Sequence, residues 1–395
     1  MSEAAALDAK LYAVTPDRRL SLRDLLEYFS KHGSLRVSDL HLKAGCPPVY
    51  RVDGALQKMK GPPLDGATVE AMARGLLSDD EWELLGRMRS VDSSHITPTM
   101  QFRLNCFRDN DGLALAIRAL DANPPAVEEI GFPNGVWRDI VARQHGLVLV
   151  TGITGAGKST TIAALISRIA EERKCRIITL EDPIEYRLTS KAAIISQREV
   201  GRDVPNFERG LRDCLREDPD VIFVGEMRDR ESTSWTLTAA ETGHLVFSTL
   251  HTRDVRGTVT RLLDMFPPLQ QDEIASQLSL GLSHIICQKL IPRADGQGRV
   301  VAMEVLNNVY GMANLIRQGK VEQIYSLLQS RTRDVPEERM MTFERSLALL
   351  VKAGLTTPLE AEKWANHPTA FLDEMQHVQQ SLAASPAPGP NPRPS

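Results

Sequence analysis

The sequence lacks the features that mark secreted, membrane-spanning and disulfide-bonded proteins. Its first ten residues contain neither the basic nor the apolar segment of a secretory signal. No stretch reaches the roughly 18 consecutive apolar residues of a membrane-spanning helix. The five cysteines stand singly, without a C-x-x-C pair, so they indicate neither a zinc site nor a disulfide framework. We therefore expect a cytoplasmic protein with reduced thiols.

A large excess of positive charge is also missing. The chain has 47 Lys and Arg residues against 51 Asp and Glu residues, a net charge of −4. This balance gives no general reason to expect a nucleic acid as a partner. The 42% hydrophobic and 25% charged content is typical of soluble globular proteins, and 395 residues predict two domains.

Breaker clusters and a change in periodicity divide the chain. Apolar and polar residues alternate over 101–107, which predicts a half-exposed antiparallel sheet in a small α/β domain. Later, strands alternate with helices, as in a mostly parallel sheet. The expected order is a flexible arm over 1–20, an α/β domain over 21–125, a linker over 126–140, a second domain with C-terminal helices over 141–370, and a disordered Pro-rich tail over 371–395. The expected strands of the second domain are 147–151, 176–180, 193–197, 221–224 and 245–249.

Residues 152–159 read Gly-Ile-Thr-Gly-Ala-Gly-Lys-Ser, a complete G-x-x-x-x-G-K-[ST] phosphate-binding loop. An apolar strand pattern precedes the loop and a helical pattern follows it, as this motif requires. Backbone N–H groups and the helix N-terminus would hold the phosphates of a nucleoside triphosphate. Lys158 would contact the β- and γ-phosphates, and the Ser159 hydroxyl would bind Mg²⁺. The predicted nucleotide-binding residues of this segment are Gly152, Thr154, Gly155, Ala156, Gly157, Lys158, Ser159 and Thr160.

Two carboxylate clusters follow apolar strands. Glu181 ends the strand predicted at 176–180, and Glu226 follows the strand predicted at 221–224. The second segment resembles a Walker B strand in which Gly225 occupies the usual aspartate position. Carboxylates beside a triphosphate can orient or deprotonate the attacking water and can hold Mg²⁺. We expect Glu181 and Glu226 to act as catalytic or metal-binding groups.

Two histidines flank the strand predicted at 245–249. His251 follows this strand, at the edge of a parallel sheet where ligands bind, and it could sense the γ-phosphate by donating a hydrogen bond. His244 precedes the strand and is a second candidate for nucleotide contact.

Taken in order, these segments resemble the secretion-type ATPase superfamily and, within it, the type IV pilus retraction ATPases (PilT-like twitching motility proteins). The resemblance covers about residues 22–365. It is carried by the P-loop and by residues 38–45, 51–54, 102–107, 181–185, 197–201, 215–220, 225–229 and 239–252.

The resemblance implies a PAS-like N-terminal α/β domain, a RecA-like P-loop ATPase domain and a homohexameric ring. It implies ATP and Mg²⁺ as ligands, Glu181 as the general base and Glu226 as support for Mg²⁺ and water. Arg103 and Arg118 are similar to the arginines of the N-terminal domain that approach the γ-phosphate when the domains close. An inner-membrane pilus platform protein, and other pilus ATPases, are the implied partners of a protein peripheral to that membrane.

The chain also departs from the retraction family. Ala313 stands where the motif Ala-Ile-Arg-Asn-Leu-Ile-Arg has its first arginine, and Gln101 stands where the family often has arginine. The short length and the lack of a tetracysteine motif favour the retraction branch over the extension branch.

Three other functions remain open from the sequence. An accessory or paralogous pilus or type II secretion ATPase would keep the same nucleotide site. A RecA-like nucleic-acid translocase would need a basic stripe or an aromatic stacking surface, and the sequence shows neither. A monomeric P-loop kinase would leave the N-terminal domain and its arginines unexplained.

Overall fold

The computed structural model describes residues 7–32, 37–52, 55–97, 100–121 and 123–383. The chain divides into two compact units, the first formed by residues 1–124 and 185–187 and the second by residues 125–184 and 188–395. Within the described residues, no helix has both the length and the apolar character needed to cross a membrane.

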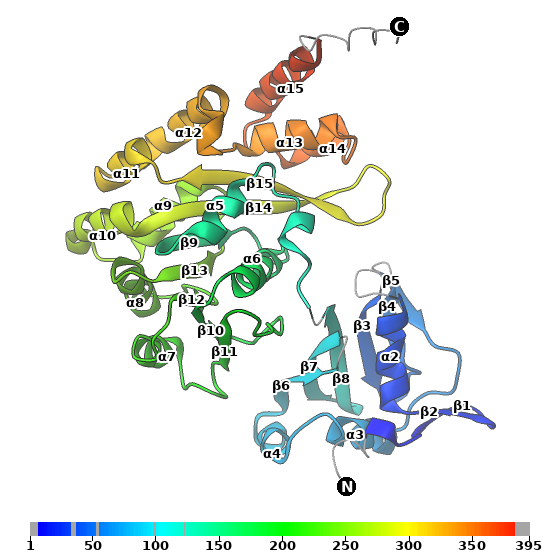
Figure 1. Cartoon of the computed structure of the whole chain (residues 1–395). Helices are drawn as coiled ribbons and strands as arrows, with labels where there is room; N and C mark the ends of the chain where they lie inside the picture. Colours follow the sequence, from blue (N-terminus) through cyan, green and yellow to red (C-terminus); the bar gives the residue numbers. More distant parts are fainter. Residues whose placement is uncertain (1–6, 33–36, 53–54, 98–99, 122, 384–395) are drawn as a thin grey trace, which may run out of the picture. The chain divides into compact units, whose positions relative to one another are not determined.

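The first unit is an antiparallel six-stranded sheet with helices (Figure 1). The strand order is β5-β4-β3-β8-β7-β6. Its elements are β1 (Tyr12–Thr15), β2 (Arg18–Leu20), α2 (Leu22–His32), β3 (Val37–Lys43), β4 (Val49–Val52), β5 (Ala55–Lys58), α3 (Gly66–Arg74), α4 (Asp79–Met88), β6 (Ser90–Ile96), β7 (Met100–Asp109) and β8 (Gly112–Asp121). Along β7, Phe102, Leu104 and Cys106 are buried while Arg103 and Asn105 are partly exposed, so the predicted alternation is confirmed over 102–106, whereas Gln101 is buried as well.

The second unit contains a seven-stranded sheet in the order β11-β10-β12-β13-β9-β14-β15. All neighbouring strands are parallel except β14 and β15, which pair antiparallel. The elements up to β13 are η1 (Val127–Glu129), α5 (Val136–Ala142), β9 (Gly146–Thr151), α6 (Lys158–Glu172), β10 (Arg176–Glu181), β11 (Ile194–Glu199), α7 (Phe207–Cys214), β12 (Val221–Val224), α8 (Arg230–Glu241) and β13 (Leu245–Leu250).

The rest of the second unit extends this sheet and adds a group of C-terminal helices. In Figure 1 these helices lie beside β15, at the end of the sheet opposite β11. The elements after β13 are α9 (Val255–Asp264), α10 (Pro268–Gly281), β14 (Leu282–Pro292), β15 (Arg299–Asn307), α11 (Tyr310–Arg317), η2 (Val321–Gln323), α12 (Ile324–Asp334), η3 (Pro336–Glu338), α13 (Phe343–Lys352), α14 (Pro358–Trp364) and α15 (Pro368–Ala383).

The core of the sheet explains why its strands could be predicted. Every residue of β9, β12 and β13 is buried, because helices cover a parallel sheet on both faces. In the sequence, such strands are short continuous apolar runs. All five expected strands are present, and their ends differ from the expected ends by at most two residues. Burying one Leu or Ile side chain stabilises the fold by about 2 kcal/mol, so these runs dominate the core of the second unit.

Three segments differ from the expected organisation. The hairpin β1–β2 occupies part of the expected arm, because Tyr12 is buried and its hydroxyl donates to the Pro62 carbonyl at 2.9 Å. The expected linker contains η1 and α5, which pack on α6 within the second unit. Helix α15 continues into the expected tail, because Phe371 is buried and Glu374 pairs with arginines of α12 and α13. Residues 1–6 and 384–395 lie outside the described residues.

Candidate nucleotide-binding site

The P-loop joins the buried strand β9 to helix α6, as the motif predicts. Gly152 has φ = 148°, and a Cβ atom at this position would lie 2.5 Å from the backbone oxygen of Gln288. Only glycine therefore fits between the end of β9 and the neighbouring strand β14. Ser159 and Thr160 lie in the first turn of α6, where backbone N–H groups have no partner within the helix.

Lys158 is a buried cation at the start of α6. Its Nζ donates to the carbonyl oxygens of Gly152 at 2.9 Å and Ile153 at 3.3 Å, and it lies 3.4 Å from Nδ1 of His251. The lysine is thus held inside the curve of the loop. A positive charge in this position is suited to binding the β- and γ-phosphates.

Four adjacent strands bring the other predicted residues to the same edge of the sheet. β10, β12, β13 and β9 are parallel neighbours, so their carboxyl ends lie side by side. Glu181 ends β10, Glu226 follows β12, His251 follows β13, and the P-loop follows β9. Ligands bind at this edge in parallel α/β sheets.

Glu181 is buried at the end of β10. Its Oε1 accepts hydrogen bonds from the Thr179 hydroxyl at 2.7 Å and from Nε2 of Gln197 at 3.1 Å. These two donors orient the carboxylate. Beside it, Gly225 approaches β10 so closely that a Cβ atom would lie 3.2 Å from the Leu180 oxygen and 3.4 Å from the Glu181 Cα. This crowding explains glycine at the usual aspartate position.

Glu226 contacts two side chains, one from its own segment after β12 and one from the segment after β13. Its Oε2 accepts from Nε of Arg228 at 2.8 Å, and its Oε1 lies 3.2 Å from Nε2 of His251. Arg228 also contacts Asp182 at 3.3 Å. With Lys158 on the other nitrogen of His251, the imidazole connects the P-loop lysine to the glutamate of the Walker B-like strand.

Helix caps fix the two loops that carry Glu226 and His251. Asp229 accepts from the Ser232 N–H at the start of α8, and Asp254 accepts from the Gly257 N–H at the start of α9. An aspartate in this role stabilises a helix by about 1 kcal/mol. Each loop is therefore anchored a few residues after its functional side chain.

The structure corrects the expectation for His244. β13 pairs in parallel with β9, and Leu245 lies opposite Gly146, at the start of both strands. His244 thus lies at the amino edge of the sheet, and a six-residue strand puts about 20 Å between it and the P-loop edge. Its Nδ1 instead contacts the Ala239 oxygen at 3.0 Å and the Thr242 hydroxyl at 3.1 Å.

The two predicted arginines belong to the first unit. Arg103 on β7 and Arg118 on β8 are direct cross-strand partners. Arg118 donates to Asp39 at 2.9 Å. Burial would raise the pKa of Asp39, but hydrogen bonds from Ser38 and Arg118 hold this pKa below its usual value. The arginine pair thus shares one face of the sheet with an ionised aspartate.

Gln288 on β14 supports the P-loop and was not identifiable from the sequence. Its buried amide donates to the Ala156 oxygen at 2.6 Å and accepts from the Thr161 hydroxyl at 3.0 Å. It therefore joins the loop to the first turns of α6. A polar residue within a strand gives no signal of this role, because its partners lie about 130 positions earlier in the chain.

Glu304 on β15 is a buried acid that holds the start of α9. Its Oε2 accepts from the Val255 N–H at 3.0 Å, four residues after His251. Burial raises the pKa of Glu304 to about 8, against the effect of this hydrogen bond. The nearby Asp254 and Glu344 carboxylates contribute to this raised pKa, whereas Lys289 opposes it.

Among the described residues, no group of three His, Cys, Asp or Glu side chains is arranged to hold a metal ion by itself. Mg²⁺ in nucleotide sites needs one or two protein oxygens, because the phosphates and water supply the rest. The hydroxyl of Ser159 and the carboxylates at the strand ends are hard oxygen donors of this kind. The donor set thus fits nucleotide-bound Mg²⁺.

Comparison with known proteins identifies the family. The family described as "Type II/IV secretion system protein" matches residues 36–380. The chain belongs to this family. It is similar to the type IV pilus retraction ATPase PilT of Pseudomonas aeruginosa, with 40% identity over 89% of this chain and 100% of that protein. It is also 39% identical to a twitching motility protein of Neisseria gonorrhoeae, over 84% of this chain and 90% of that protein.

A solved structure extends the comparison to three dimensions. The crystal structure of the pilus retraction motor PilT with bound ADP has a TM-score of 0.82 and 40% sequence identity, over 90% of this chain and 99% of that chain. The predicted resemblance and the predicted fold class are thereby confirmed: an N-terminal α/β domain followed by a RecA-like domain. With its complete P-loop, this secretion family member is a P-loop ATPase.

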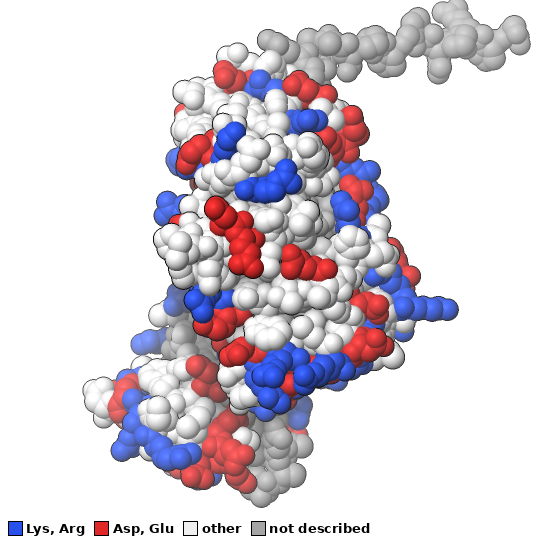
Figure 2. Space-filling model, turned by 90° about the vertical axis from the view of Figure 1, so that its left-hand side faces the viewer, with Lys and Arg blue, Asp and Glu red and all other residues white. Residues whose placement is uncertain are grey.

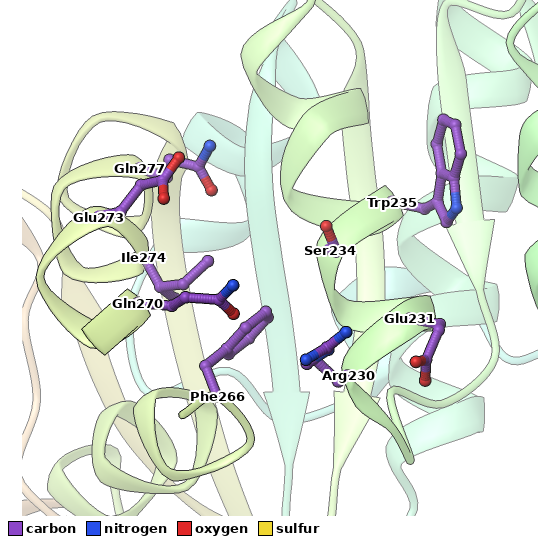
Figure 3. Close-up of a pocket in the computed structure, with 9 residues that line it drawn as sticks. All are labelled: Arg230, Glu231, Ser234, Trp235, Phe266, Gln270, Glu273, Ile274 and Gln277. Carbon is purple, nitrogen blue, oxygen red and sulfur yellow. The ribbon is translucent and has the colours of Figure 1, made fainter. Parts of the chain in front are cut away.

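The ATPase domain also has a groove of about 320 Å³ between α8 and α10. Figure 3 shows its lining. The lining residues are Arg230, Glu231, Ser234, Trp235, Phe266, Gln270, Glu273, Ile274 and Gln277. They include neither the P-loop residues nor Glu181, Glu226 and His251, so this groove is separate from the nucleotide-binding edge.

The raised pKa of Glu304 makes stability depend on pH. The folded ATPase domain keeps a proton on Glu304 that the unfolded chain releases near its ordinary pKa of 4.5. This contribution to stability is complete below pH 4.5 and is lost as the pH rises toward 8. Glu304→Gln imitates the protonated acid and keeps an acceptor for Val255. We expect urea unfolding midpoints to show that the wild type loses stability relative to Glu304→Gln between pH 5.5 and 8.5. Parallel midpoints in both proteins would contradict a protonated Glu304.

Proposed function

We propose that this ATPase is a homohexameric motor that uses ATP hydrolysis to retract type IV pili by pilin disassembly and so drives twitching motility. The observation that carries its chemistry is the single row formed by Glu181, Glu226, His251 and the P-loop at one sheet edge. The output is supported by the similarity to retraction ATPases, which extends through both units of the chain. The motor would act in the cytoplasm, peripheral to the inner membrane, on a pilus platform protein.

In this proposal the residues of the row divide phosphate binding, proton transfer and Mg²⁺ binding among them. The P-loop amides and Lys158 bind the phosphates. Glu181, fixed by Thr179 and Gln197, takes the proton of the attacking water. Ser159, Glu181 and Glu226 would hold Mg²⁺, which neutralises phosphate charge when bound with ATP. His251 contacts Lys158 through Nδ1 and Glu226 through Nε2, and in this proposal its Nε2–H exchanges Glu226 for the γ-phosphate when ATP binds.

The first unit supplies the remaining charge in this proposal. The guanidinium groups of Arg103 and Arg118 stabilise the charge that spreads over the transferring phosphoryl group. Because they belong to a separate unit, catalysis requires the arginines and the P-loop to meet within or between subunits of the ring. Hydrolysis would in this way be coupled to motion between units.

Ala313 favours a second candidate, an accessory or paralogous secretion or pilus ATPase that keeps the same nucleotide site but has another output. It lies on α11, which contacts α10 and α12 and is not part of the nucleotide-binding edge. Alanine supplies none of the bidentate contacts of an arginine. Nucleic-acid translocation is less well supported, because Asp and Glu lie among Lys and Arg on the face in Figure 2.

Lys158→Ala tests the role of the P-loop. It removes the charge that lies inside the loop, so ATP binding should weaken and hydrolysis should be lost. Steady-state ATPase assays and titration with a fluorescent ATP analogue measure the two effects. Lys191→Ala is the control, since Lys191 is a surface lysine paired with Glu171. If Lys158→Ala hydrolyses ATP at the wild-type rate, the P-loop does not take part in hydrolysis.

Glu181→Gln tests the assignment of the base. The amide keeps the shape and the Thr179 contact but cannot take a proton, so kcat should fall by about 10² or more while ATP still binds. Glu226→Gln is the matched comparison at the adjacent strand end. If Glu226→Gln lowers kcat more than Glu181→Gln does, with binding intact, the base is Glu226.

Ala313→Arg distinguishes the two outputs. Since α11 lies away from the nucleotide-binding edge, we expect the natural chain to hydrolyse ATP normally but to restore twitching weakly in a strain that lacks its retraction ATPase. Ala313→Arg should improve twitching without raising turnover, and Gln318→Arg on the same segment controls for added charge. If the natural chain restores full twitching, the presence of alanine at position 313 has no effect on the output. If neither the natural chain nor Ala313→Arg restores twitching, the result supports the second candidate.

A further inference from the structure

A chain of buried hydroxyl and thiol groups runs beneath the nucleotide-binding edge. Oγ1 of Thr252 lies 2.7 Å from Oγ1 of Thr258, which lies 3.4 Å from Oγ1 of Thr151. Thr151 donates to Sγ of Cys287 at 2.7 Å. Thr151 directly precedes the P-loop and Thr252 directly follows His251, so the chain connects two segments of the site.

The hydrogen-bond directions make Thr258 the acceptor of the Thr252 hydroxyl, whereas its 3.4 Å approach to Thr151 is a contact without a donated proton. Its own hydroxyl proton goes to the Asp254 carbonyl at 2.8 Å, one turn earlier in α9. A hydroxyl has one proton to donate, so the short contact with Thr252 is donated by Thr252. Thr258 is fully buried, and Thr252 is 9% exposed. Water therefore has little access to replace this bond.

Helix α9 is a rigid support for that acceptor. The Asp254 carboxylate caps the helix, and Glu304 binds the Val255 N–H from the neighbouring strand. The position of Thr258 is thus fixed from two sides before it contacts Thr252. The short segment that bears His251 is held at one end by β13 and at the other by this hydroxyl.

We propose that Thr258 is a positioning residue that holds the His251 segment in place through its hydrogen bond with Thr252, beside Thr151 at the start of the P-loop. The proposal rests on the proposed role of His251 toward the γ-phosphate. Without the Thr258 hydroxyl, the buried Thr252 hydroxyl loses its acceptor, and the His251 segment is free to shift. Hydrolysis depends on that geometry, whereas binding of ADP depends on the P-loop itself.

Thr258→Val tests this role because it removes the hydroxyl and keeps the β-branched shape. We expect kcat for ATP to fall by about tenfold or more, since small misplacements at a reacting centre cost this much. ADP affinity, measured with a fluorescent analogue, should stay within about twofold of the wild type, and amides 251–254 should exchange hydrogen faster. Thr258→Ser should restore kcat.

Thr332→Val is the matched control. Thr332 is also a buried helical threonine that donates to the carbonyl four residues earlier, at 2.7 Å, but it lies on α12. If the wild type hydrolyses ATP and Thr258→Val has the same kcat as Thr332→Val, the role of Thr258 is overturned. The proposed function is not affected by that result. A wild type without ATP hydrolysis would overturn the proposed function and this role with it. Equal losses of kcat and ADP affinity, without rescue by serine, would indicate a structural role and overturn the proposal.

A double-mutant cycle keeps the proposal testable if Thr258→Val folds poorly. Thr252→Val removes the donor of the same bond, and we expect a similar fall in kcat. If both residues act through one bond, Thr252→Val/Thr258→Val should be no slower than the single variants. Multiplying losses would show that the two hydroxyls act independently and would overturn the proposal.

Discussion

The P-loop keeps its shape because the strand beside it contributes a buried amide. Gln288 binds the Ala156 carbonyl and the Thr161 hydroxyl, and its own backbone oxygen leaves room for nothing larger than Gly152. A loop that presents its N–H groups to phosphates must satisfy its carbonyls elsewhere, or bury them without partners at a cost of about 1–3 kcal/mol each. β14 and the lysine of the loop meet this requirement together. The other nucleotide-site residues are arranged around a loop that is already fixed.

Parallel strand pairing then determines which residues can join that loop. A side chain at the carboxyl end of a neighbouring strand reaches the edge, and one at the amino end is a full strand length away. Glu181, Glu226 and His251 satisfy this condition, and His244 does not. The same register places Gly225 beside the end of β10, where a Cβ atom would crowd the Leu180 oxygen and the Glu181 Cα.

The strength of each sequence signal follows from where its physical cause lies. The P-loop and the strands 147–151 and 221–224 carry their signal locally, in glycine spacing and in apolar runs that bury completely. β14 and β15 contain Gln288 and Glu304, which are buried because distant partners satisfy them, so these polar residues interrupt the apolar runs of the two strands. For His244, the residue type was suggestive, but strand direction decided the outcome. The hydroxyl chain through Thr258 is likewise invisible before the fold is known.

In the proposed motor, the groups that act on ATP and the helix that carries Ala313 belong to different elements. The groups proposed to act on ATP gather at the edge formed by β10, β12, β13 and β9, whereas α11 with Ala313 follows β15 at the end of the sheet opposite β11. We therefore expect a substitution on α11 to leave the rate of ATP turnover unchanged. The two regions are joined through α9, because its N-terminus carries Thr258 near the site and is bound by Glu304 of β15, the strand that leads into α11. A chain of this family can in this way keep its catalytic residues unchanged and acquire a different output.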